Sequence, residues 1–317
     1  MQEAEREHLI ANAPSHVSGP RWHRPLRRLA IALAAISIAL ACALALGAGP
    51  EDSDPPKPLP PGIHVPTYTP GVLPFKQGDE LVYQASWVGI PAANARIRIA
   101  RDPEAPELWS AQVWIFTNPL TDKLYRMRDY MREDFAPDSL QPSTMLIRQH
   151  EGRRWSNYDV TFDRRRELVT MVKQGPRGTS TQRFRSANPF GMVTGALMAL
   201  TQPLEVGRTL SLDAFSGTTR YVFDLTVTGR DRITTPLGTF DAFRVVPSIE
   251  YLSGGTVNDK AQNTVLWVSA DNRRLPLRIQ SAVFIGYVQA DLVNVIDGSH
   301  PKPAAVATPH GAVQTDG

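Results

Sequence analysis

One segment of the chain decides its fold, residues 188–200: Asn188-Pro189-Phe190-Gly191-Met192-Val193-Thr194-Gly195-Ala196-Leu197-Met198-Ala199-Leu200. Asn188 is a good helix N-cap, and Pro189 suits the first helical position because the N–H of that position has no intrahelical partner. The segment is apolar on nearly every side, and a helix without a polar face must be covered all round. Burying its six large apolar side chains contributes roughly 10 kcal/mol of gross transfer free energy. We therefore predict a helix from Pro189 to Leu200 that a curved sheet encloses.

Outside this segment the dominant hydrophobic period is two, which is typical of strands with one wet face. The alternation runs through residues 81–87, 93–99, 109–115, 145–147, 158–162, 169–171, 221–227, 243–245, 265–268, 275–279 and 287–293. Residues 121–131 fit either a short helix or another strand. Roughly ten to twelve strands with mostly short connections predict an antiparallel meander, and a twisted sheet of that size tends to curl. The predicted fold class is mainly β: a large antiparallel meander curled into a half-barrel around one apolar helix.

The N-terminal part of the chain predicts a transmembrane or signal helix. Residues 1–28 are polar and end in four arginines, Arg21, Arg24, Arg27 and Arg28. Residues 29–48 then run for twenty residues with Ser37 as the most polar member. As a helix this run spans roughly 30 Å, the thickness of a bilayer core. Because the arginines precede the run and acidic residues follow it, the positive-inside rule places the rest of the chain outside the cytoplasm.

Three interpretations of residues 29–48 remain open. The first is an uncleaved signal anchor, which the spanning length and the long preceding arm favour. The second is a cleaved signal peptide, because small-residue sites such as Ala43-Leu44-Ala45 are present. The third is lipidation at Cys42, although Ala39 and Leu40 match a lipoprotein box poorly. Cys42 is the only cysteine, so the domain after it can hold neither an intramolecular disulfide nor a cysteine nucleophile.

Composition divides the chain into five parts. Residues 1–28 are predicted as a cytoplasmic arm, residues 29–48 as the membrane segment, and residues 49–74 as a linker that its nine prolines hold extended. Residues 75–297 are the β-rich periplasmic domain, and residues 298–317 are a polar tail that is predicted to be disordered. The predicted location is the inner membrane with the domain in the periplasm, or the periplasm itself if the leader is cleaved.

Two segments in the last third of the chain carry a family resemblance. They are Thr235-Pro236-Leu237-Gly238-Thr239-Phe240-Asp241-Ala242-Phe243-Arg244-Val245 and Leu266-Trp267-Val268-Ser269-Ala270-Asp271-Asn272-Arg273-Arg274-Leu275-Pro276-Leu277-Arg278. With the opening Gly78-Asp79-Glu80-Leu81-Val82-Tyr83, they resemble the exported bacterial family called domain-of-unknown-function family 3108 over about residues 75–293. The resemblance implies a periplasmic, mostly β protein, a half-barrel like the lipoprotein carriers that wrap a sheet around a helix. It implies no activity and transfers no catalytic residue.

The sequence offers no convincing catalytic or metal-binding constellation. Six of the seven histidines lie outside the predicted domain, and His150 falls on a largely polar strand face, where a solvated histidine is expected. Asp129, Glu133 and Asp134 are close in sequence, and paired acids can divide acid and base roles. Their arginine neighbours favour ordinary surface ion pairs instead. We therefore predict no enzyme activity, no metal site and no cofactor.

The region of residues 148–185 is locally basic, with ten basic and four acidic residues. Its arginines gather at predicted hairpin tips, in the pair Arg153 and Arg154 and in the run Arg164, Arg165 and Arg166. Such clusters outside the cytoplasm can contact anionic lipid headgroups, so these five are the candidate binding residues. Ordinary solvation of the tips is the alternative. The net charge of +3 and the pI near 9.1 are too weak to predict a nucleic-acid partner.

The leading functional hypothesis is a non-enzymatic cell-envelope protein whose curved sheet binds a lipid-like or amphipathic ligand, or an envelope partner. The expected partners are the inner membrane, through the N-terminal helix, and a lipid or envelope protein. One alternative is a hydrolase that acts on envelope polysaccharide or lipid through Glu133, Asp134 and His150. The other is a purely structural interaction module.

Overall fold

The computed structural model describes residues 65–101, 105–215, 220–251, 263–283 and 286–299. The predicted cytoplasmic arm, the membrane segment with Cys42 and residues 300–317 lie outside these ranges, as do residues 49–64 of the predicted linker. The helices in the described ranges include none that combines the length and the hydropathy that a membrane span requires. The membrane helix over residues 29–48 stays a prediction.

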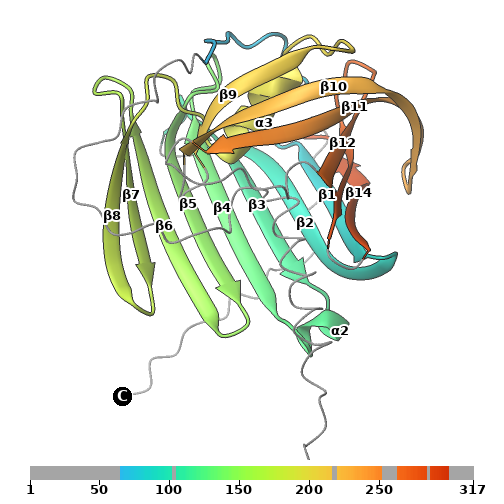
Figure 1. Cartoon of the computed structure of the whole chain (residues 1–317), viewed down its shortest axis with the longest axis horizontal. Coiled ribbons are helices and arrows are strands. Elements are labelled where there is room, and N and C mark those ends of the chain that lie inside the picture. The colour runs from blue at the N-terminus through green and yellow to red at the C-terminus, as the bar shows by residue number, and fades with distance from the viewer. Residues whose placement is uncertain (1–64, 102–104, 216–219, 252–262, 284–285, 300–317) are drawn as a thin grey trace, which may run out of the picture.

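Fourteen strands in one antiparallel sheet make up most of the described chain (Figure 1). The first eight are β1 (Glu80–Trp87), β2 (Ile90–Arg101), β3 (Trp109–Thr117), β4 (Met127–Phe135), β5 (Pro142–Glu151), β6 (Arg154–Asp163), β7 (Leu168–Gly175) and β8 (Gly178–Arg185). The other six are β9 (Thr209–Phe215), β10 (Arg220–Thr235), β11 (Gly238–Tyr251), β12 (Thr264–Ser269), β13 (Pro276–Ala282) and β14 (Tyr287–Ile296). Two helices accompany them, α2 (Pro119–Asp122) and α3 (Met192–Thr201).

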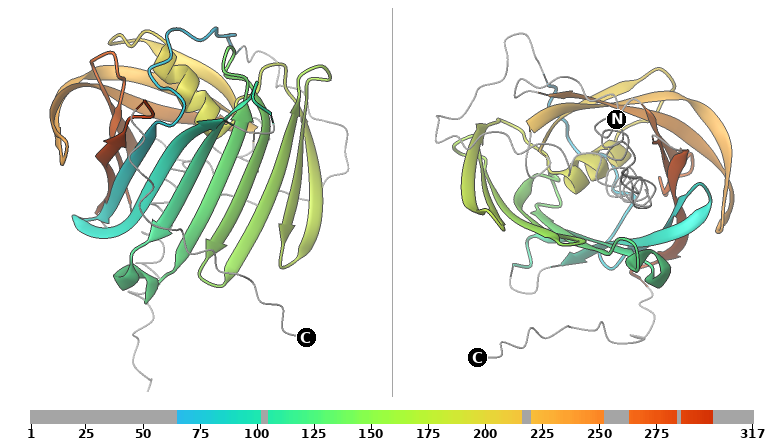
Figure 2. Two further views of the ribbon diagram at one scale, coloured as in Figure 1. Left: turned by 180° about the vertical axis from the view of Figure 1, so that it is seen from behind. Right: turned by 60° about the horizontal axis from the view of Figure 1, so that its bottom comes forward.

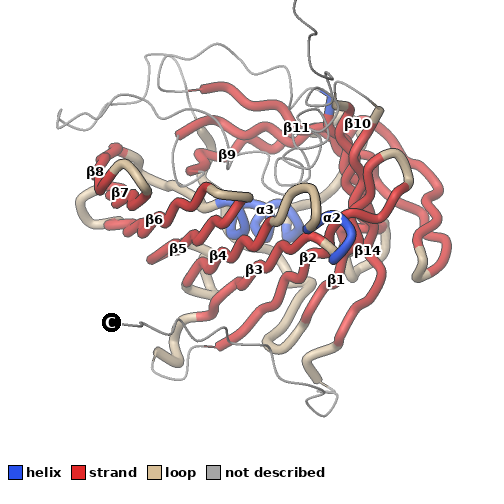
Figure 3. The backbone as a smooth tube through the Cα atoms, turned by 90° about the horizontal axis from the view of Figure 1, so that it is seen from below, coloured by secondary structure: helices blue, strands red, loops and turns tan. Residues whose placement is uncertain are grey.

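The strand order is β8-β7-β6-β5-β4-β3-β2-β1-β14-β13-β12-β11-β10-β9. The first and last strands of the meander, β1 and β14, pair with each other, so β8 and β9 are the two edges. The sheet curls into an incomplete ring, and α3 lies inside it in the right-hand view of Figure 2. The view from below in Figure 3 again places α3 within the curve. The predicted half-barrel around an apolar helix is confirmed.

The predicted number of strands is too low, and polar strands explain the difference. Edge strand β8 alternates only between exposed and half-buried residues, so it carries no hydrophobic signal. The ambiguous segment 121–131 contains the end of α2 and, from Met127, the start of β4. On β4 the alternation is present but consists of charged residues on one face and a mixture of acids and apolar residues on the other. Hydrophobicity alone does not reveal such strands.

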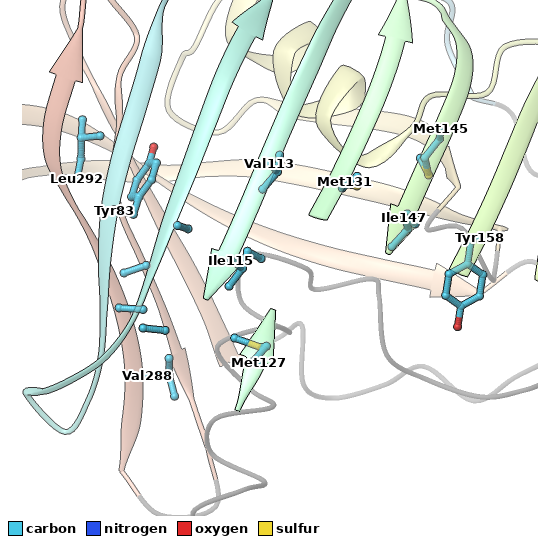
Figure 4. Packing of buried hydrophobic residues seen from close by; sticks show 14 of the residues in the cluster. Tyr83, Val113, Ile115, Met127, Met131, Met145, Ile147, Tyr158, Val288 and Leu292 are labelled. Carbon is cyan, nitrogen blue, oxygen red and sulfur yellow. The ribbon is translucent and has the colours of Figure 1, made fainter. Parts of the chain in front are cut away.

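The core lies on the inner, concave face of the sheet. Its main cluster runs without a break from Leu292 on β14 and Tyr83 on β1 to Tyr158 on β6. Figure 4 shows these residues along the concave side of successive strands, with Val113 and Met131 between them. The period of two therefore selects the core, because alternate side chains of a strand point to opposite faces.

Helix α3 begins at Met192, later than the predicted Pro189. The reason is Phe190, which forms a backbone bridge to β9. Its N–H donates to the Asp213 carbonyl and its carbonyl accepts from the Phe215 N–H, both at 2.8 Å. A residue held in this extended bridge cannot be part of the helix.

The N-terminus of α3 is capped by a carboxylate from β4, because its own N-cap residue, Gly191, has no side chain. Glu133 is fully buried, and its two oxygens accept hydrogen bonds from Val193 N at 2.9 Å and Thr194 N at 2.8 Å. These N–H groups belong to the first turn, where the helix supplies no acceptor and its dipole favours negative charge. Burial raises the pKa of the Glu133 carboxyl, and the two backbone hydrogen bonds oppose that rise. The contact anchors α3 to the first half of the sheet.

An extended segment, residues 65–79, covers the outer side of α3. Tyr68, Leu73 and Phe75 pack against the cluster that contains Leu197 and Met198. The hydrogen bonds that hold it run from Asn188 Nδ2 to Thr67 Oγ1 (2.8 Å), from Gln202 Nε2 to Thr69 O (3.0 Å) and from Ser211 N to the Tyr68 hydroxyl (3.2 Å). Asn188, the predicted N-cap, thus contacts this segment instead. Residues 65–74, predicted as the end of the linker, pack on the domain.

A buried ion pair joins the two edges of the sheet at one end. Arg220 Nη2 lies 2.5 Å from Asp213 Oδ2, and both side chains are 5% exposed. Ser186, which follows β8, donates to the same carboxylate oxygen at 2.6 Å. Arg220 also donates to the carbonyl of Arg185, the last residue of β8. Side chains therefore connect β8 to β9 where the sheet has no backbone pairing.

Substitution of Gly191 by Ala tests the cap on α3. A Cβ at this position would lie 2.4 Å from Glu133 Oε2, so the carboxylate must leave the helix N-terminus. We expect the free energy of unfolding, measured by urea denaturation, to fall by about 2 to 4 kcal/mol, because two buried N–H groups lose their acceptors.

Gly195→Ala on the same helix is the matched control. Its Cβ would meet Phe190 at 3.4 Å and Leu212 at 3.6 Å, which are ordinary contacts. Since alanine is also the better helix former, stability should change by less than about 1 kcal/mol. Equal losses in the two variants would contradict the capping role of Glu133.

Candidate functional site

A cavity of about 220 Å³ lies between α3 and the inner face of β10 to β13. Its lining is almost entirely apolar and draws on both halves of the sheet. The helix contributes Met192, Val193, Gly195, Ala196, Ala199 and Leu200, and the sheet contributes mainly Val113, Met131, Leu225, Val227, Val245, Ile249, Leu266 and Ile279.

Helix α3 has two different faces, although its sequence is apolar on both. Thr194, Leu197 and Met198 are buried against the strands and the covering segment. Ala196 is exposed, and Leu200 is half-buried. Both line the cavity, one turn apart. The prediction that the sheet covers the helix all round is therefore wrong for this face, because the helix packs on β4 and β9 and leaves space toward β10 to β13.

The floor of the cavity is a row of aliphatic side chains that crosses four strands. The register pairs Val227 on β10 with Val245 on β11, Val245 with Leu266 on β12, and Leu266 with Ile279 on β13. All four line the cavity. Residues paired across antiparallel strands share a face, so the row is continuous. The four side chains form a short, continuous apolar strip along the floor of the cavity.

Apart from Arg208, the polar side chains in the lining of the cavity bond to other protein atoms. The Tyr83 hydroxyl donates to Pro276 O at 2.8 Å, and Thr264 Oγ1 lies 2.7 Å from Ser281 Oγ. Burial raises the pKa of the Tyr83 phenol, which keeps it neutral. Gln202 Nε2 donates to Thr69 O of the covering segment at 3.0 Å. The apolar lining of the cavity can hold an apolar group.

A pair of acids lies elsewhere on the inner face, at the start of β4. Asp129 is 7% exposed; its Oδ1 accepts a hydrogen bond from His150 N at 3.0 Å, while Oδ2 has no partner among the described residues. Burial raises the pKa of Asp129 to about 7, and the neighbouring Glu151 carboxylate adds to the rise. The Glu151 carboxylate thus favours the protonated form of Asp129. Its Oε2 accepts from the Tyr125 hydroxyl at 2.9 Å.

The sequence predicted surface ion pairs for three acids. That prediction is wrong for Asp129 and Glu133 and is correct for Asp134. Asp134 faces outward and pairs with Arg132 at 2.7 Å. The signal was present in the sequence, because the acids at 129 and 133 alternate in phase with Met131 and the arginines alternate out of phase. That pattern places both acids inside.

The residues considered for hydrolysis do not converge. Glu133 points inward and caps α3, whereas Asp134 and the exposed His150 lie on the outer face. Within the described ranges, no three His, Cys, Asp or Glu side chains gather in a way that could hold a metal ion.

The five arginines that were predicted to contact lipid headgroups lie in two separate groups. Arg153 and Arg154 lie at the β5–β6 turn, and Arg164, Arg165 and Arg166 at the β6–β7 turn; all five are exposed. The ten residues of β6 separate these turns by roughly 30 Å. A single headgroup therefore cannot contact both groups.

The end of the sheet that carries α2, which we call the α2 end, is both basic and apolar. The β1–β2, β3–β4, β5–β6 and β7–β8 connections all lie there, because successive strands alternate in direction. Its exposed large apolar residues are Val88, Ile90, Leu120, Leu124 and Trp155. Its exposed basic residues are Lys123, Arg126, Arg153, Arg154 and Arg177. Asp122 is engaged with Arg128, and Glu151 with Tyr125, so nearby acids are occupied.

The raised pKa of Asp129 predicts a pH dependence of stability. The unfolded carboxyl ionises near pH 3.8 and the folded one near pH 7. Between these values the unfolded chain has released a proton that the folded chain retains, so the free energy of unfolding falls as pH rises through this window. Asp129→Asn removes this loss. Its stability relative to the natural protein should grow from pH 4 to pH 7, by up to about 4 kcal/mol, and then level off.

Urea unfolding across that pH range measures the effect. Asp134→Asn, on the outer face of the same strand, controls for the loss of one negative charge. Parallel pH profiles for Asp129→Asn and the natural protein would show that Asp129 ionises normally in the fold.

Among solved structures, the chain is similar to three proteins that share little sequence with it. A β-barrel-like protein of domain-of-unknown-function family DUF1849 from Brucella abortus is 8% identical with a TM-score of 0.47, and the match covers 69% of this chain and 97% of that one. A protein from Bacteroides fragilis, described as exported with a YmcC-like fold, is 11% identical with a TM-score of 0.28, covering 72% and 100%. A protein from Parabacteroides distasonis, described as a lipoprotein, is 9% identical with a TM-score of 0.29, covering 71% and 99%.

No curated protein matches the chain. A family model described as protein of unknown function, DUF3108, matches residues 82–293. That range is about two thirds of the 317 residues and runs from β1 to β14, the whole of the curled sheet. The resemblance seen in the Gly-Thr-Phe-Asp-Ala and Asp-Asn-Arg-Arg-Leu-Pro segments is thereby confirmed, and the chain belongs to the DUF3108 family of proteins of unknown function.

Proposed function

We propose that this protein is a non-enzymatic binding protein of the cell envelope that holds the apolar part of an amphipathic molecule in its cavity. The observation that carries the proposal is the apolar cavity between α3 and the inner face of β10 to β13. A curved sheet with an internal helix normally fills its concavity with side chains. Here one face of the helix lines open space.

The size of the cavity suits a short chain or part of a longer one. An apolar cavity of about 150 Å³ takes a six-carbon ring, so 220 Å³ is sufficient for roughly eight or nine carbon atoms. At about 0.8 kcal/mol per methylene group, eight carbons contribute roughly 6 kcal/mol of gross transfer free energy. The loss of translational and rotational freedom on binding offsets much of this gain. An apolar tail alone would therefore bind weakly.

The absence of a converging acid–base group in the described part of the cavity lining favours binding over hydrolysis. Tyr83 is a neutral donor whose hydroxyl is already bonded to Pro276. Glu133 is committed to the helix N-terminus. The acids that remain, Asp129 and Glu151, do not line the cavity.

We further propose that the α2 end rests on the surface of the membrane to which residues 29–48 attach the chain. Its basic residues match the negative charge of anionic headgroups, and its exposed apolar side chains can enter the interface between headgroups and acyl chains. Arg153 and Arg154 belong to this surface, whereas Arg164 to Arg166 lie at the opposite end of β6. Residues 49–64 lie outside the described ranges; their prolines predict an extended spacer, which would reach roughly 50 Å. That length is sufficient for either end of the domain to approach the bilayer.

Ligand binding is tested with the full-length protein by organic extraction and lipid mass spectrometry. We expect the natural protein to retain an amphiphile, and Ala196→Phe, which places a ring in the cavity, to lose most of it. Thr161→Phe adds the same ring on the outer face of β6 and should leave the bound amount unchanged. An empty natural protein, or equal amounts in both variants, would count against the cavity as the binding site.

Membrane contact is tested by cosedimentation with vesicles, using chains that lack residues 1–48 so that the anchor does not dominate. Vesicles that contain anionic lipid should bind the domain, and Arg153→Ala with Arg154→Ala should weaken this binding by about 2 kcal/mol in total, at about 1 kcal/mol per basic residue. The matched control is the double variant Arg164→Ala with Arg165→Ala. If both double variants bind alike, the α2 end is not the membrane-contacting surface.

A further inference from the structure

We infer that the amphiphile held in the cavity carries an anionic headgroup, a carboxylate or a phosphate monoester, and that Arg208 binds this headgroup at the rim. The inference rests on the proposed function and adds the chemical class of the ligand. It starts from the position of Arg208, which lies between α3 and β9 and lines the cavity.

Backbone hydrogen bonds determine which way Arg208 faces. Gly207 N donates to Val227 O at 2.8 Å, and Val227 N donates to Arg208 O at 2.9 Å, so the pairing of β9 with β10 continues one residue beyond Thr209. Alternation then puts Arg208 on the same face as Leu210, which is buried on the inner side of β9. The backbone is thus held in place while the side chain reaches both the cavity and solvent.

Arg208 lies at one end of the row of aliphatic side chains that crosses the floor of the cavity. Its pairing partner Val227 continues into Val245, Leu266 and Ile279. A positive charge at one end of a row of aliphatic side chains matches a molecule with a negative head and an apolar tail. The headgroup would lie at the solvent-exposed end, where a charge need not be buried.

The Arg208 guanidinium is available for a ligand. It forms no ion pair with any carboxylate in the described part of the chain, including the exposed Glu205 three residues before it. The other polar groups of the lining, among them Tyr83 and Gln202, already bond to protein atoms. Guanidinium groups bind carboxylate and phosphate oxygens with two parallel hydrogen bonds, which gives direction as well as strength.

Two more arginines make the same region electropositive. The guanidinium carbons of Arg230 and Arg274 lie 4.5 Å and 5.4 Å from the centre of the Phe243 ring, and Phe243 packs in the same cluster as Val227. Arg274 Nη1 is buried without a hydrogen-bond partner among the described residues. The acids nearest to them in sequence have other partners: Asp231 accepts from the Trp267 indole and pairs with Arg244, and Asp271 pairs with Arg273. The positive charge of the two arginines on this cluster favours an anionic over a cationic headgroup.

The test uses full-length protein and three eight-carbon probes: octanoate, octyl phosphate and octanol. By isothermal titration calorimetry, at least one anion should bind the natural protein more tightly than octanol does. Arg208→Ala should weaken binding of that anion by about 10- to 100-fold, the strength of a charged hydrogen bond, and leave octanol unchanged. Arg208→Lys keeps the charge without the paired donors and should recover part of the loss. The anion that binds more tightly identifies the headgroup as a carboxylate or a phosphate.

Arg183→Ala, which removes an exposed arginine from edge strand β8, is the control and should bind all three probes normally. If octanol binds but Arg208→Ala leaves both anions unaffected, the headgroup assignment is wrong and the proposed function stands. If the natural protein binds none of the three probes, the cavity is not a binding site and the proposed function falls with the inference.

Discussion

The contact between Glu133 and the N-terminus of α3 is the constraint on which the rest of the structure depends. A carboxylate from the middle of β4 supplies acceptors for two N–H groups that the helix cannot satisfy itself. The glycine at the N-cap leaves room for that carboxylate, since any Cβ there would overlap it. Glu133 and the bridge at Phe190 therefore hold one side of the helix against β4 and β9, and its other face is directed at β10 to β13. The cavity lies on this second face.

Buried charges connect the two edges of the curled sheet. A ring of strands that does not close leaves two edges, β8 and β9, with backbone groups that lack partners in the sheet. The Asp213–Arg220 pair, with Ser186 and the carbonyl of Arg185, connects the edges at one end. Both charges are buried, but each is matched by the other and by further hydrogen bonds, which is the condition under which buried ions are tolerated.

Asp129 on β4 is a buried acid that, unlike Asp213, is not matched by an arginine in the described part of the chain. Burial, together with the neighbouring Glu151 carboxylate, raises the pKa of Asp129 to about 7, and its Oδ2 has no hydrogen-bond partner among the described residues. The described residues therefore include a buried acid that caps a helix, Glu133, and two that pair with arginines, Asp213 with Arg220 and Glu80 with Arg96. Asp129 lies outside the cavity lining, and its raised pKa lowers stability at neutral pH.

The proposed activities use different ends of the molecule. The α2 end combines exposed arginines with exposed apolar side chains, as expected for a surface that contacts anionic lipid. The cavity lies beside α3, where Arg208 pairs with no described carboxylate and a row of aliphatic side chains leads inward; Arg230 and Arg274 lie over the Phe243 ring, which clusters with Val227 of that row. This arrangement would let the domain stay in contact with a membrane while it holds a ligand away from the bilayer surface.

The fold class could be predicted from the amino-acid pattern, because a period of two marks one face of each strand as apolar, and the apolar run around Leu197 requires a largely buried position. The sequence by itself also determined the family, through the turn segments near Gly238 and Asn272. Tertiary structure alone decided where α3 begins, since the bridge at Phe190 involves β9. It alone decided that Glu133 caps the helix and that Arg208 stands at the head of an aliphatic row. These features depend on which strands are neighbours and on which surfaces are packed against each other. Local periodicity predicts the face of the strand on which a residue lies, but it does not predict which residues contact that face.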